Sequence, residues 1–551
     1  MLLKKLVSLV VVSIPLIVSC GGGSGVTSDN ESPAVAKVTP LSGAESVDTT
    51  ASVSVTFDED IVASLVNSSS FSLKEGDEEV PASVVFDEAS ITATLQAERP
   101  LSLLTKYTAT VSSSISDLAG NQLTGDFSWS FTTRDGQWRE PKPAEFDDNG
   151  NALFSLAMAN DRGDPTVIWS QHDGTVYRVW TKQYEQGSGW SEPVLLSSSA
   201  AVEDSIAYSA SMNKDGVIVT LWREGNSVWT NFYQPESGWQ SAQRIEAFDG
   251  VQSYLKDVVI DSQGNAVAIV SNKSDGASVY NLWATHFVAG EGWSAPVLVE
   301  NSDYANVTHS KTVVDEQGVV TVVWRQQTDA DSDWDLWSRR YSVESGWGAP
   351  ELVEQLDNVA GSRISAFVDS ENNVWIGWYH RDTNYSAYIN KYTPGTGWAE
   401  PTLLENDNTS DAQMPRVVVD KSGQVTVVWQ HYDYDDNDDL GRIFVRSYTP
   451  ESGWNEPVAI YENASSSYFE PEMTIDNNGH IMLAWEDGSK ILATRYSKTQ
   501  GWSETETLQD QENTSAFGIN PIADTAGRVW LFFLVVDRTS GLRDLLYSEF
   551  N

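Results

Sequence analysis

One repeated position in the chain carries acids, bases and amides in turn. It lies four residues before the Asp or Asn of a tight turn that recurs along residues 135–551. In chain order it is occupied by Leu156, Ser209, Asp257, Lys311, Ser365, Arg416, Glu472 and Asn520. His309, Arg363 and Glu470 lie two residues earlier in three of the units. This mixture of donors and acceptors suits the recognition of a small polar ligand or a glycan.

Two acidic segments carry oxygen ligands at alternate positions. The first holds Asp329, Asp331 and Asp333, and the second holds Asp435, Asn437 and Asp439. Alternating oxygens on a short loop suit Ca²⁺, although neither segment has the glycine and the final glutamate of an EF-hand. A solvated acidic loop is the alternative, and calorimetry at millimolar Ca²⁺ would distinguish the two. Trp334 lies beside the first segment and is a candidate platform for a ligand.

A third set of acidic residues follows a repeated Trp by seven or eight residues. Its members are Glu145, Glu246, Glu300, Glu354, Glu405, Glu462 and Asp510, with Ser197 at the equivalent place in one unit. Because this set repeats, we expect it to serve the scaffold and to keep sheet edges soluble.

Other chemistry finds little support in the sequence. The six histidines have no metal-binding spacing, and there is no phosphate loop or Gly-x-Ser-x-Gly elbow. The chain has 34 Lys and Arg against 78 Asp and Glu, a formal net charge of −44. This excess of acid argues against nucleic acid as a partner, because phosphate binding needs Lys and Arg.

The elements that must position these residues follow a repeat of about 50 residues. Each unit begins at a Trp that follows Gly or Gly-X, namely Trp138, Trp190, Trp239, Trp293, Trp347, Trp398, Trp454 and Trp502. A strand ending at a turn of the form Asp-x-x-Gly comes next, with Asp369 and Asn372 in one unit. A second strand carries Trp six residues after that turn in most units. A third strand carries two aromatic or Leu residues four apart.

Four short strands in each unit predict an all-β fold, an eight-bladed β-propeller with seven blades as the alternative. We expect residues 138–146 to pair with the last strand and close the ring, which removes an exposed edge. The first polar set would then line the central channel. A wet polar channel without a ligand is the alternative interpretation. Most of the 22 Trp belong to the repeat and are expected to be packing residues.

The repeat resembles the sialidase-like and Asp-box propellers in its Asp-x-x-Gly turn and downstream Trp. The Asp-box pattern has one residue between Asp and Gly, whereas here there are two. The Arg-Ile-Pro motif of sialidases is also absent from the sequence. The resemblance therefore brings no catalytic residues to this chain.

Residues 34–134 alternate apolar and polar residues in short runs, such as 51–57 and 107–111, which predicts a β-sandwich. The segment resembles the bacterial Ig-like domain of surface-layer proteins, through Pro40-Leu-Ser-Gly-Ala44, Asp117-Leu-Ala-Gly-Asn121 and Trp129-Ser-Phe131. The resemblance implies a stalk or spacer. Asp117 and Asn121 are expected to form a turn rather than a ligand site.

Residues 1–19 combine Lys4 and Lys5 with a short apolar run, typical of a secretory signal. Ile17-Val-Ser-Cys20 resembles the bacterial lipobox, which implies lipidation of Cys20, the single Cys of the chain. Gly21 after the Cys implies sorting to the outer membrane by the same resemblance. Residues 20–33 would form a flexible tether.

These features together predict an exported, lipid-anchored monomer on the periplasmic or outer face of the outer membrane. We expect a non-catalytic binding module that presents its variable loops to a glycan or a protein. A secreted glycosidase or polysaccharide lyase acting at the channel mouth is the alternative, with Asp257, Lys311, Arg416 and Glu472 as its acids and bases.

Overall fold

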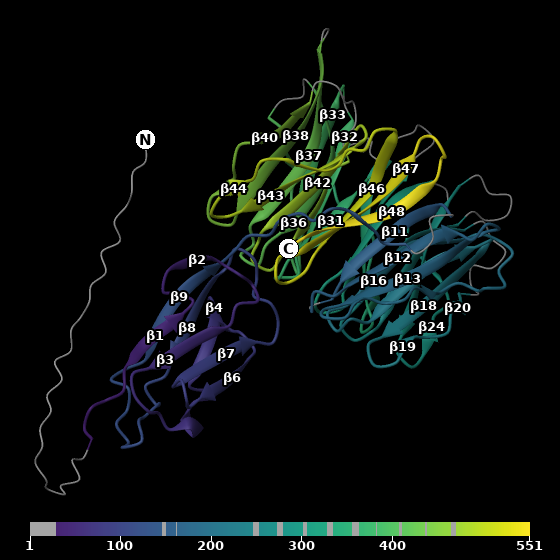
Figure 1. Ribbon diagram of the computed structural model, residues 1–551. Helices are drawn as coiled ribbons and strands as arrows, with labels where there is room; N and C mark the ends of the chain where they lie inside the picture. The colour runs from purple at the N-terminus through teal and green to yellow at the C-terminus, as the bar shows by residue number, and fades with distance from the viewer. Residues whose placement is uncertain are drawn as a thin grey trace, which may run out of the picture. The chain divides into compact units, whose positions relative to one another are not determined.

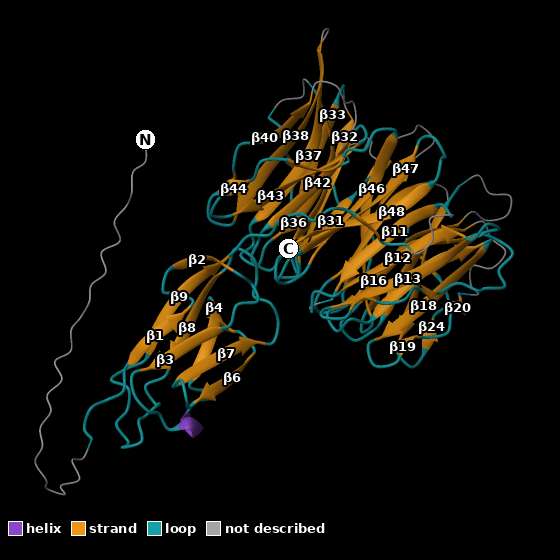
Figure 2. Cartoon of the chain, in the orientation of Figure 1, coloured by secondary structure: helices purple, strands orange, loops and turns teal. Residues whose placement is uncertain are grey.

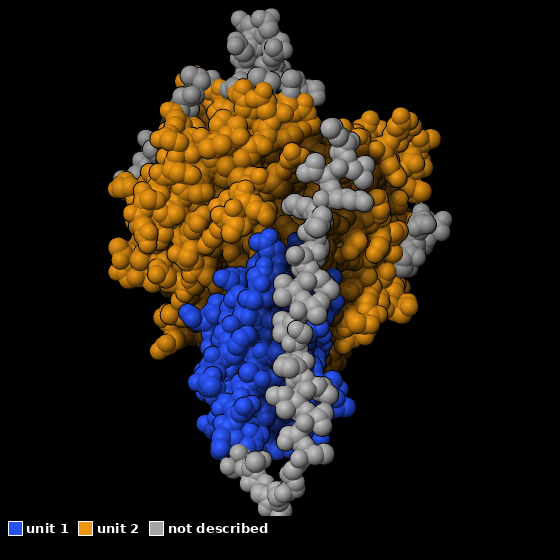
Figure 3. All heavy atoms as spheres, turned by 60° about the vertical axis from the view of Figure 1, so that its left-hand side comes forward, with its two compact units in different colours: residues 1–99, 106–132 blue, residues 100–105, 133–551 orange. Residues whose placement is uncertain are grey.

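The computed structural model describes residues 29–145, 150–160, 162–245, 253–272, 279–300, 306–327, 334–354, 363–381, 383–406, 410–435, 438–463 and 470–551. Over these residues the fold is all-β (Figure 2), with one 3₁₀ turn at Ala63–Leu65. No helix in this part of the chain is long and apolar enough to cross a membrane. The chain forms two compact units, residues 1–99 with 106–132 and residues 100–105 with 133–551 (Figure 3).

The first unit is a sandwich of two antiparallel sheets. One sheet has the order β1-β3-β7-β6, with β1 at Val35–Thr39, β3 at Val53–Phe57, β7 at Thr92–Ala97 and β6 at Ala82–Asp87. The other has the order β2-β9-β8-β4-β5, with β2 at Ala44–Val47, β9 at Phe127–Thr133, β8 at Lys106–Val111, β4 at Phe71–Glu75 and β5 at Glu78–Glu79. Alternate residues of β3, β8 and β9 are buried, as the period-2 pattern predicted.

The second unit contains eight sheets, so the predicted eight-bladed propeller is confirmed and the seven-bladed alternative is wrong. The innermost strands are β11 (Ala152–Ala159), β16 (Ser205–Met212), β21 (Ser253–Ile260), β26 (Val307–Val314), β31 (Ser365–Val368), β36 (Asp411–Val419), β41 (Glu472–Ile475) and β46 (Thr514–Ala523). Each innermost strand contacts the next one around the ring, and β46 contacts β11, so the ring is closed.

The remaining strands of each blade lie outside these (Figure 1). Second strands are β12 (Pro165–His172), β17 (Ile218–Glu224), β22 (Ala266–Asn272), β27 (Val320–Gln327), β32 (Val374–Arg381), β37 (Val425–Asp435), β42 (Ile481–Asp487) and β47 (Val529–Asp537). Third strands are β13 (Tyr177–Glu185), β18 (Ser227–Gln234), β23 (Asn281–Val288), β28 (Trp334–Ser342), β33 (Tyr385–Thr393), β38 (Asp438–Thr449), β43 (Lys490–Ser497) and β48 (Arg543–Phe550).

The outer edge of seven blades consists of two short pieces that both pair with the third strand. The first piece is the Gly-Trp pair, seen as β14 (Gly189–Trp190), β19 (Gly238–Trp239), β24 (Gly292–Trp293), β29 (Gly346–Trp347), β34 (Gly397–Trp398), β39 (Gly453–Trp454) and β44 (Gly501–Trp502). The second piece is β15 (Val194–Leu195), β20 (Gln243–Arg244), β25 (Val297–Leu298), β30 (Glu351–Leu352), β35 (Thr402–Leu403), β40 (Val458–Asn463) and β45 (Glu506–Gln509).

The eighth blade takes its outer edge from the start of the propeller. Strand β10 (Lys142–Pro143) pairs with β48, and Trp138 bridges Phe550, as the repeat phase predicted. A hydrophobic core that includes Trp169 of the first blade and Phe532 of the eighth packs across the join. The ring therefore closes by strand pairing between the two ends of the propeller chain, which leaves no open blade edge there.

The tight turns explain why Asp, Asn and Gly recur at fixed spacing. In the third blade, Asp261 Oδ1 accepts hydrogen bonds from the backbone N–H groups of Gln263 and Asn265, each at 2.8 Å. The fourth turn residue takes a left-handed backbone, for example Gly264 with φ 84°. Asn372 fills this position in the fifth blade with φ 62°, which fits the expectation that Asn replaces Gly there.

The repeated Trp residues are packing residues. Those that end second strands, Trp169, Trp222, Trp324, Trp378, Trp429 and Trp485, are fully buried between blades. Trp375 and Trp530, which the repeat did not explain, are also buried. The high Trp count therefore reflects packing between blades and not a surface on which sugars stack.

Candidate functional site

The channel contains a cavity of about 680 Å³ against the innermost strands of five successive blades, β21, β26, β31, β36 and β41. The innermost strands alternate in length here, because β26 and β36 have 8 and 9 residues whereas β31 and β41 have 4 each. The charged and titratable residues of its lining are Lys256, His309, Lys311, Arg363, Arg416 and Glu472. Its volume is in the range of small-molecule sites.

The structure brings four of the predicted ligand-binding residues into this one cavity, namely Lys311, Arg363, Arg416 and Glu472. Arg416 and Glu472 form a two-pronged ion pair, with Nε to Oε2 at 3.0 Å and Nη2 to Oε1 at 2.7 Å. Arg363 donates to Glu470 at 2.6 Å. These pairs join neighbouring and next-neighbouring blades, and they hold the guanidinium groups in fixed positions.

The sequence pattern predicted that Asp257 lines the channel, but the structure places it elsewhere. Its side chain is buried and accepts hydrogen bonds from Ser209 Oγ at 2.9 Å and from the backbone N–H of Thr312 at 3.0 Å. It also lies 3.4 Å from Lys311 Nζ. Asp257 therefore links the inner strands of three successive blades and positions Lys311, and it does not itself line the cavity.

A bulge in the innermost strands explains this placement. The pairing register shifts between Leu255 and Asp257 in β21, and in β26 it shifts one residue further from the turn, between Thr308 and Ser310. The extra residues are Lys256 and His309, and both line the cavity. A bulge turns one extra side chain to the same side, which simple alternation along a strand does not foresee.

His309 lies in a basic part of the cavity. Partial desolvation, together with the nearby charges of Lys256, Arg325 and Arg363, lowers its pKa to about 4. Its ring is therefore neutral at physiological pH and offers one donor and one acceptor.

Trp334 does not line the cavity. It begins β28, and the guanidinium of Arg325 lies over its ring, 4.1 Å from the centroid. Because Arg325 is one of the cations that act on His309, Arg325 links Trp334 to the channel. It is a cation–π partner in this structure rather than an open platform.

Glu486 is a titratable residue near the cavity that the sequence did not single out. It lies on β42, directly after the buried Trp485, and accepts a hydrogen bond from the backbone N–H of Gly518 at 2.7 Å. Burial raises its pKa to about 7, with Glu470 and Glu472 acting in the same direction. The position after the second-strand Trp varies between units, as Arg325, Gln430 and Glu486 show, and this variation was the available signal.

The outer carboxylates that the structure describes divide into two groups, and Glu246 lies outside the described residues. Glu145, Glu300, Glu354 and Glu405 stand seven residues after their Trp and are buried. Each accepts a hydrogen bond from a third-strand backbone N–H, for example Glu405 Oε2 from Ala387 at 3.0 Å. Ser197 Oγ accepts the same bond, from Val179 at 3.1 Å. These residues cap backbone groups, in agreement with a scaffold role.

Glu462 and Asp510 stand eight residues after their Trp and behave differently. A register shift in β40 and in β45 adds one residue and moves these side chains outward. Glu462 pairs with Arg442 at 2.7 Å, and Asp510 pairs with Lys490 at 3.3 Å. They are surface ion pairs rather than caps.

The predicted calcium loops fall largely outside the described residues. Asp329, Asp331, Asp333 and Asn437 are not among the described residues. The backbone of Asp435 and Asp439 is described, but their side chains are not. Cys20 and the preceding signal segment also lie outside the described residues.

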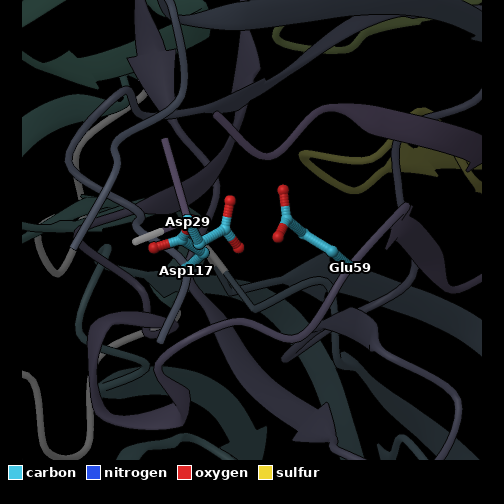
Figure 4. Close-up of side chains that lie close together, drawn as sticks. All are labelled: Asp29, Glu59 and Asp117. Carbon is cyan, nitrogen blue, oxygen red and sulfur yellow. The ribbon is translucent and has the colours of Figure 1, made fainter. Parts of the chain in front are cut away.

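A group of acids in the first unit comes close enough to share a cation. Carboxylate oxygens of Asp29, Glu59 and Asp117 lie within 4.8 Å of one another (Figure 4). Partial desolvation and then the neighbouring carboxylates raise the pKa of Glu59. Both oxygens of Asp117 accept hydrogen bonds from Asn121 at 2.8 Å, which is the turn that the sequence predicted for these residues.

Comparison with known proteins gives a family match for one segment of the chain. Residues 29–133 match the family model of the bacterial Ig-like domain. No protein of curated function matches the sequence.

Solved structures similar to this chain share little sequence with it. The polysaccharide lyase Uly1 is 10% identical with a TM-score of 0.43, over 62% of this chain and 89% of that one. A protein of unknown function from Dyadobacter fermentans is 11% identical with a TM-score of 0.36, over 76% and 99%. Prolyl oligopeptidase B from Galerina marginata is 12% identical with a TM-score of 0.40, over 71% and 56%. Similarity at this level assigns neither a family nor an activity to the propeller.

Proposed function

We propose that this protein is an exported, lipid-anchored binding module whose propeller channel holds a glycan or a protein segment. The observation that carries this proposal is the cavity of about 680 Å³, in which side chains from separate blades converge. Backbone-capping residues repeat around the ring, whereas the cavity residues do not, which is expected of positions that read a ligand.

Anchoring through Cys20, sorting to the outer membrane and the division into a tether (20–33), an Ig-like stalk (34–134) and a propeller (135–551) belong to the same proposal. The stalk would hold the propeller away from the lipid. Labelling cells with a palmitate analogue tests the anchor, since Cys20→Ala should abolish labelling and release the protein from the membrane fraction. Retained labelling in that variant would contradict lipidation at Cys20.

Binding is tested by applying the full chain, purified in detergent, to a glycan array and to a pull-down. We expect Arg363→Gln and Arg416→Gln to lower affinity at least tenfold, because both side chains line the cavity. Arg442→Gln is the matched control, since Arg442 pairs with Glu462 on the outer edge. Equal affinity in all three variants would place the ligand elsewhere and leave the channel as a wet polar pore.

The second candidate is a carbohydrate-active enzyme, and Glu486 is the observation that favours it. A carboxyl group with a pKa of about 7 can exchange protons at physiological pH, and it lies close enough to Arg363 for their charges to interact. Turnover of a polysaccharide that is lost in Glu486→Gln, or in Glu472→Ala with Asp257→Ala, while binding is retained would support the enzyme. Binding without turnover across the panel supports the module.

A further inference from the structure

Basic side chains gather at the channel cavity of a strongly acidic protein. The chain has 34 Lys and Arg against 78 Asp and Glu, yet the cavity lining holds Lys256, Lys311, Arg363 and Arg416 with a single acid, Glu472. This is not a general property of the channel. A second cavity of about 330 Å³, beside the tight turns of the same strands, is lined by Glu316, Asp369, Asp420 and Asp476 with one base, Lys421.

Most of the cavity bases are matched by an acid. Lys311 faces Asp257, Arg363 faces Glu470, and Arg416 faces Glu472. Lys256 is the exception, because it makes no hydrogen bond or ion pair with any residue that the structure describes. Desolvation is the one cause that lowers the pKa of Lys256. A half-buried ammonium without a counter-charge is costly, and a bound anion would remove that cost.

A second observation also indicates a negatively charged ligand. His309 occupies the bulge next to that of Lys256 around the ring, and three separate cations act on it, namely Lys256, Arg325 and Arg363. More than one cation therefore acts on the part of the cavity around the two bulges, and the positive charge there is not confined to one side chain. In walls of low dielectric the potential of such charges concentrates anions.

We infer that the cavity takes an acidic oligosaccharide, whose carboxylate or sulfate pairs with Lys256 while its hydroxyl groups bond the remaining polar lining. This inference rests on the proposed binding function and names its ligand class. Fixed guanidinium groups suit the flat or tetrahedral oxyanion of such a sugar. The neutral ring of His309 and the hydroxyl groups of Ser365 and Thr474 suit its hydroxyl groups.

The inference is tested by calorimetry on the full chain in detergent with two matched pairs of probes. The first pair is tetragalacturonate and its fully methyl-esterified form, and the second is a sulfated galactan oligosaccharide and its desulfated form. We expect the charged member of at least one pair to bind at least tenfold more tightly, with affinity falling as NaCl rises from 50 to 300 mM. The pair that responds distinguishes carboxylate from sulfate.

Variants localise the effect to the cavity. We expect Lys256→Gln to lower affinity for the charged probe at least tenfold, and Lys256→Arg to retain it. Lys490→Gln makes the same charge change at the outer edge, where Lys490 pairs with Asp510, and should have no effect. The thermal unfolding midpoint of each variant checks that it is folded.

The outcomes separate this inference from the proposed function. If neutral probes bind as tightly as charged ones, or Lys256→Gln has no effect, the acidic-ligand inference is wrong and glycan binding stands. If no glycan of either kind binds, and an acidic peptide does not bind either, both are wrong. If only the acidic peptide binds, the cavity remains a binding site, but the inference that its ligand is an oligosaccharide is wrong.

Discussion

Two rings of charged residues in the propeller look alike in the sequence and serve different purposes in the structure. At the outer edge, four buried glutamates at one spacing accept hydrogen bonds from backbone N–H groups of their own blades. Around the channel, charged residues pair across blades and surround a cavity, as Arg416 and Glu472 do. A charge that recurs at the same place in several units stabilises those units, whereas a charge that changes from unit to unit is available for a ligand.

The largest effect expected from this contrast is on stability at the outer ring. Glu405→Ala leaves the backbone N–H of Ala387 buried without its acceptor and should lower the free energy of unfolding by about 2–3 kcal/mol. Glycan affinity should be unchanged. Denaturant unfolding of the full chain measures the first quantity and calorimetry the second.

The matched control for this prediction is Glu462→Ala. Glu462 pairs with Arg442 at the surface, and such pairs contribute roughly 0–1 kcal/mol. If Glu462→Ala lowers the free energy of unfolding as much as Glu405→Ala does, the proposed difference between backbone caps and surface ion pairs is wrong.

Replacing Glu486, near the channel, should raise the free energy of unfolding, whereas replacing Glu405 lowers it, and the increase should appear only at high pH. Its pKa rises from 4.5 to about 7 in the folded state, so the folded protein binds more protons than the unfolded chain between these values. The free energy of unfolding therefore falls as pH rises through this window. Glu486→Gln should relieve this cost and stabilise the protein by on the order of 2 kcal/mol at pH 8.5.

At pH 4.5 the advantage of Glu486→Gln should be small, because the wild-type carboxyl is then largely protonated in the folded state. Thermal midpoints across the pH range measure the difference between the two proteins. A gain that is equal at both pH values would show that packing, not ionisation, separates them.

The smallest effect concerns the one unit that uses a neutral cap. Ser197→Ala removes the acceptor for the N–H of Val179 and should cost about 1 kcal/mol, less than Glu405→Ala, because a neutral hydroxyl makes a weaker bond than a carboxylate. Parallel denaturation of the two variants gives the comparison directly. A cost for Ser197→Ala that equals or exceeds the cost for Glu405→Ala would mean that charge adds nothing to the cap.

Much of the fold was predictable because the repeat shows each local rule eight times over. The Trp and turn spacings indicated the blades, and Asn372 fitted the single unit that lacks glycine. Ring closure followed from the phase of the repeat, with Trp138 at one end and Phe550 at the other. Three of the four predicted residues in the cavity share one repeat position and Arg363 lies two residues before it, so their proximity could be anticipated.

The sequence by itself determined the period, the alternation and the turn chemistry, since these depend on residues close together in the chain. Tertiary structure decided which charged side chains reach the cavity. A bulge brings Lys256 to the lining and leaves Asp257 to link blades, and one added residue separates the surface pair of Glu462 from the buried cap of Glu405. Such shifts depend on how the strands pack together, and the alternation of residues alone does not show which side chains they turn toward the cavity or the surface.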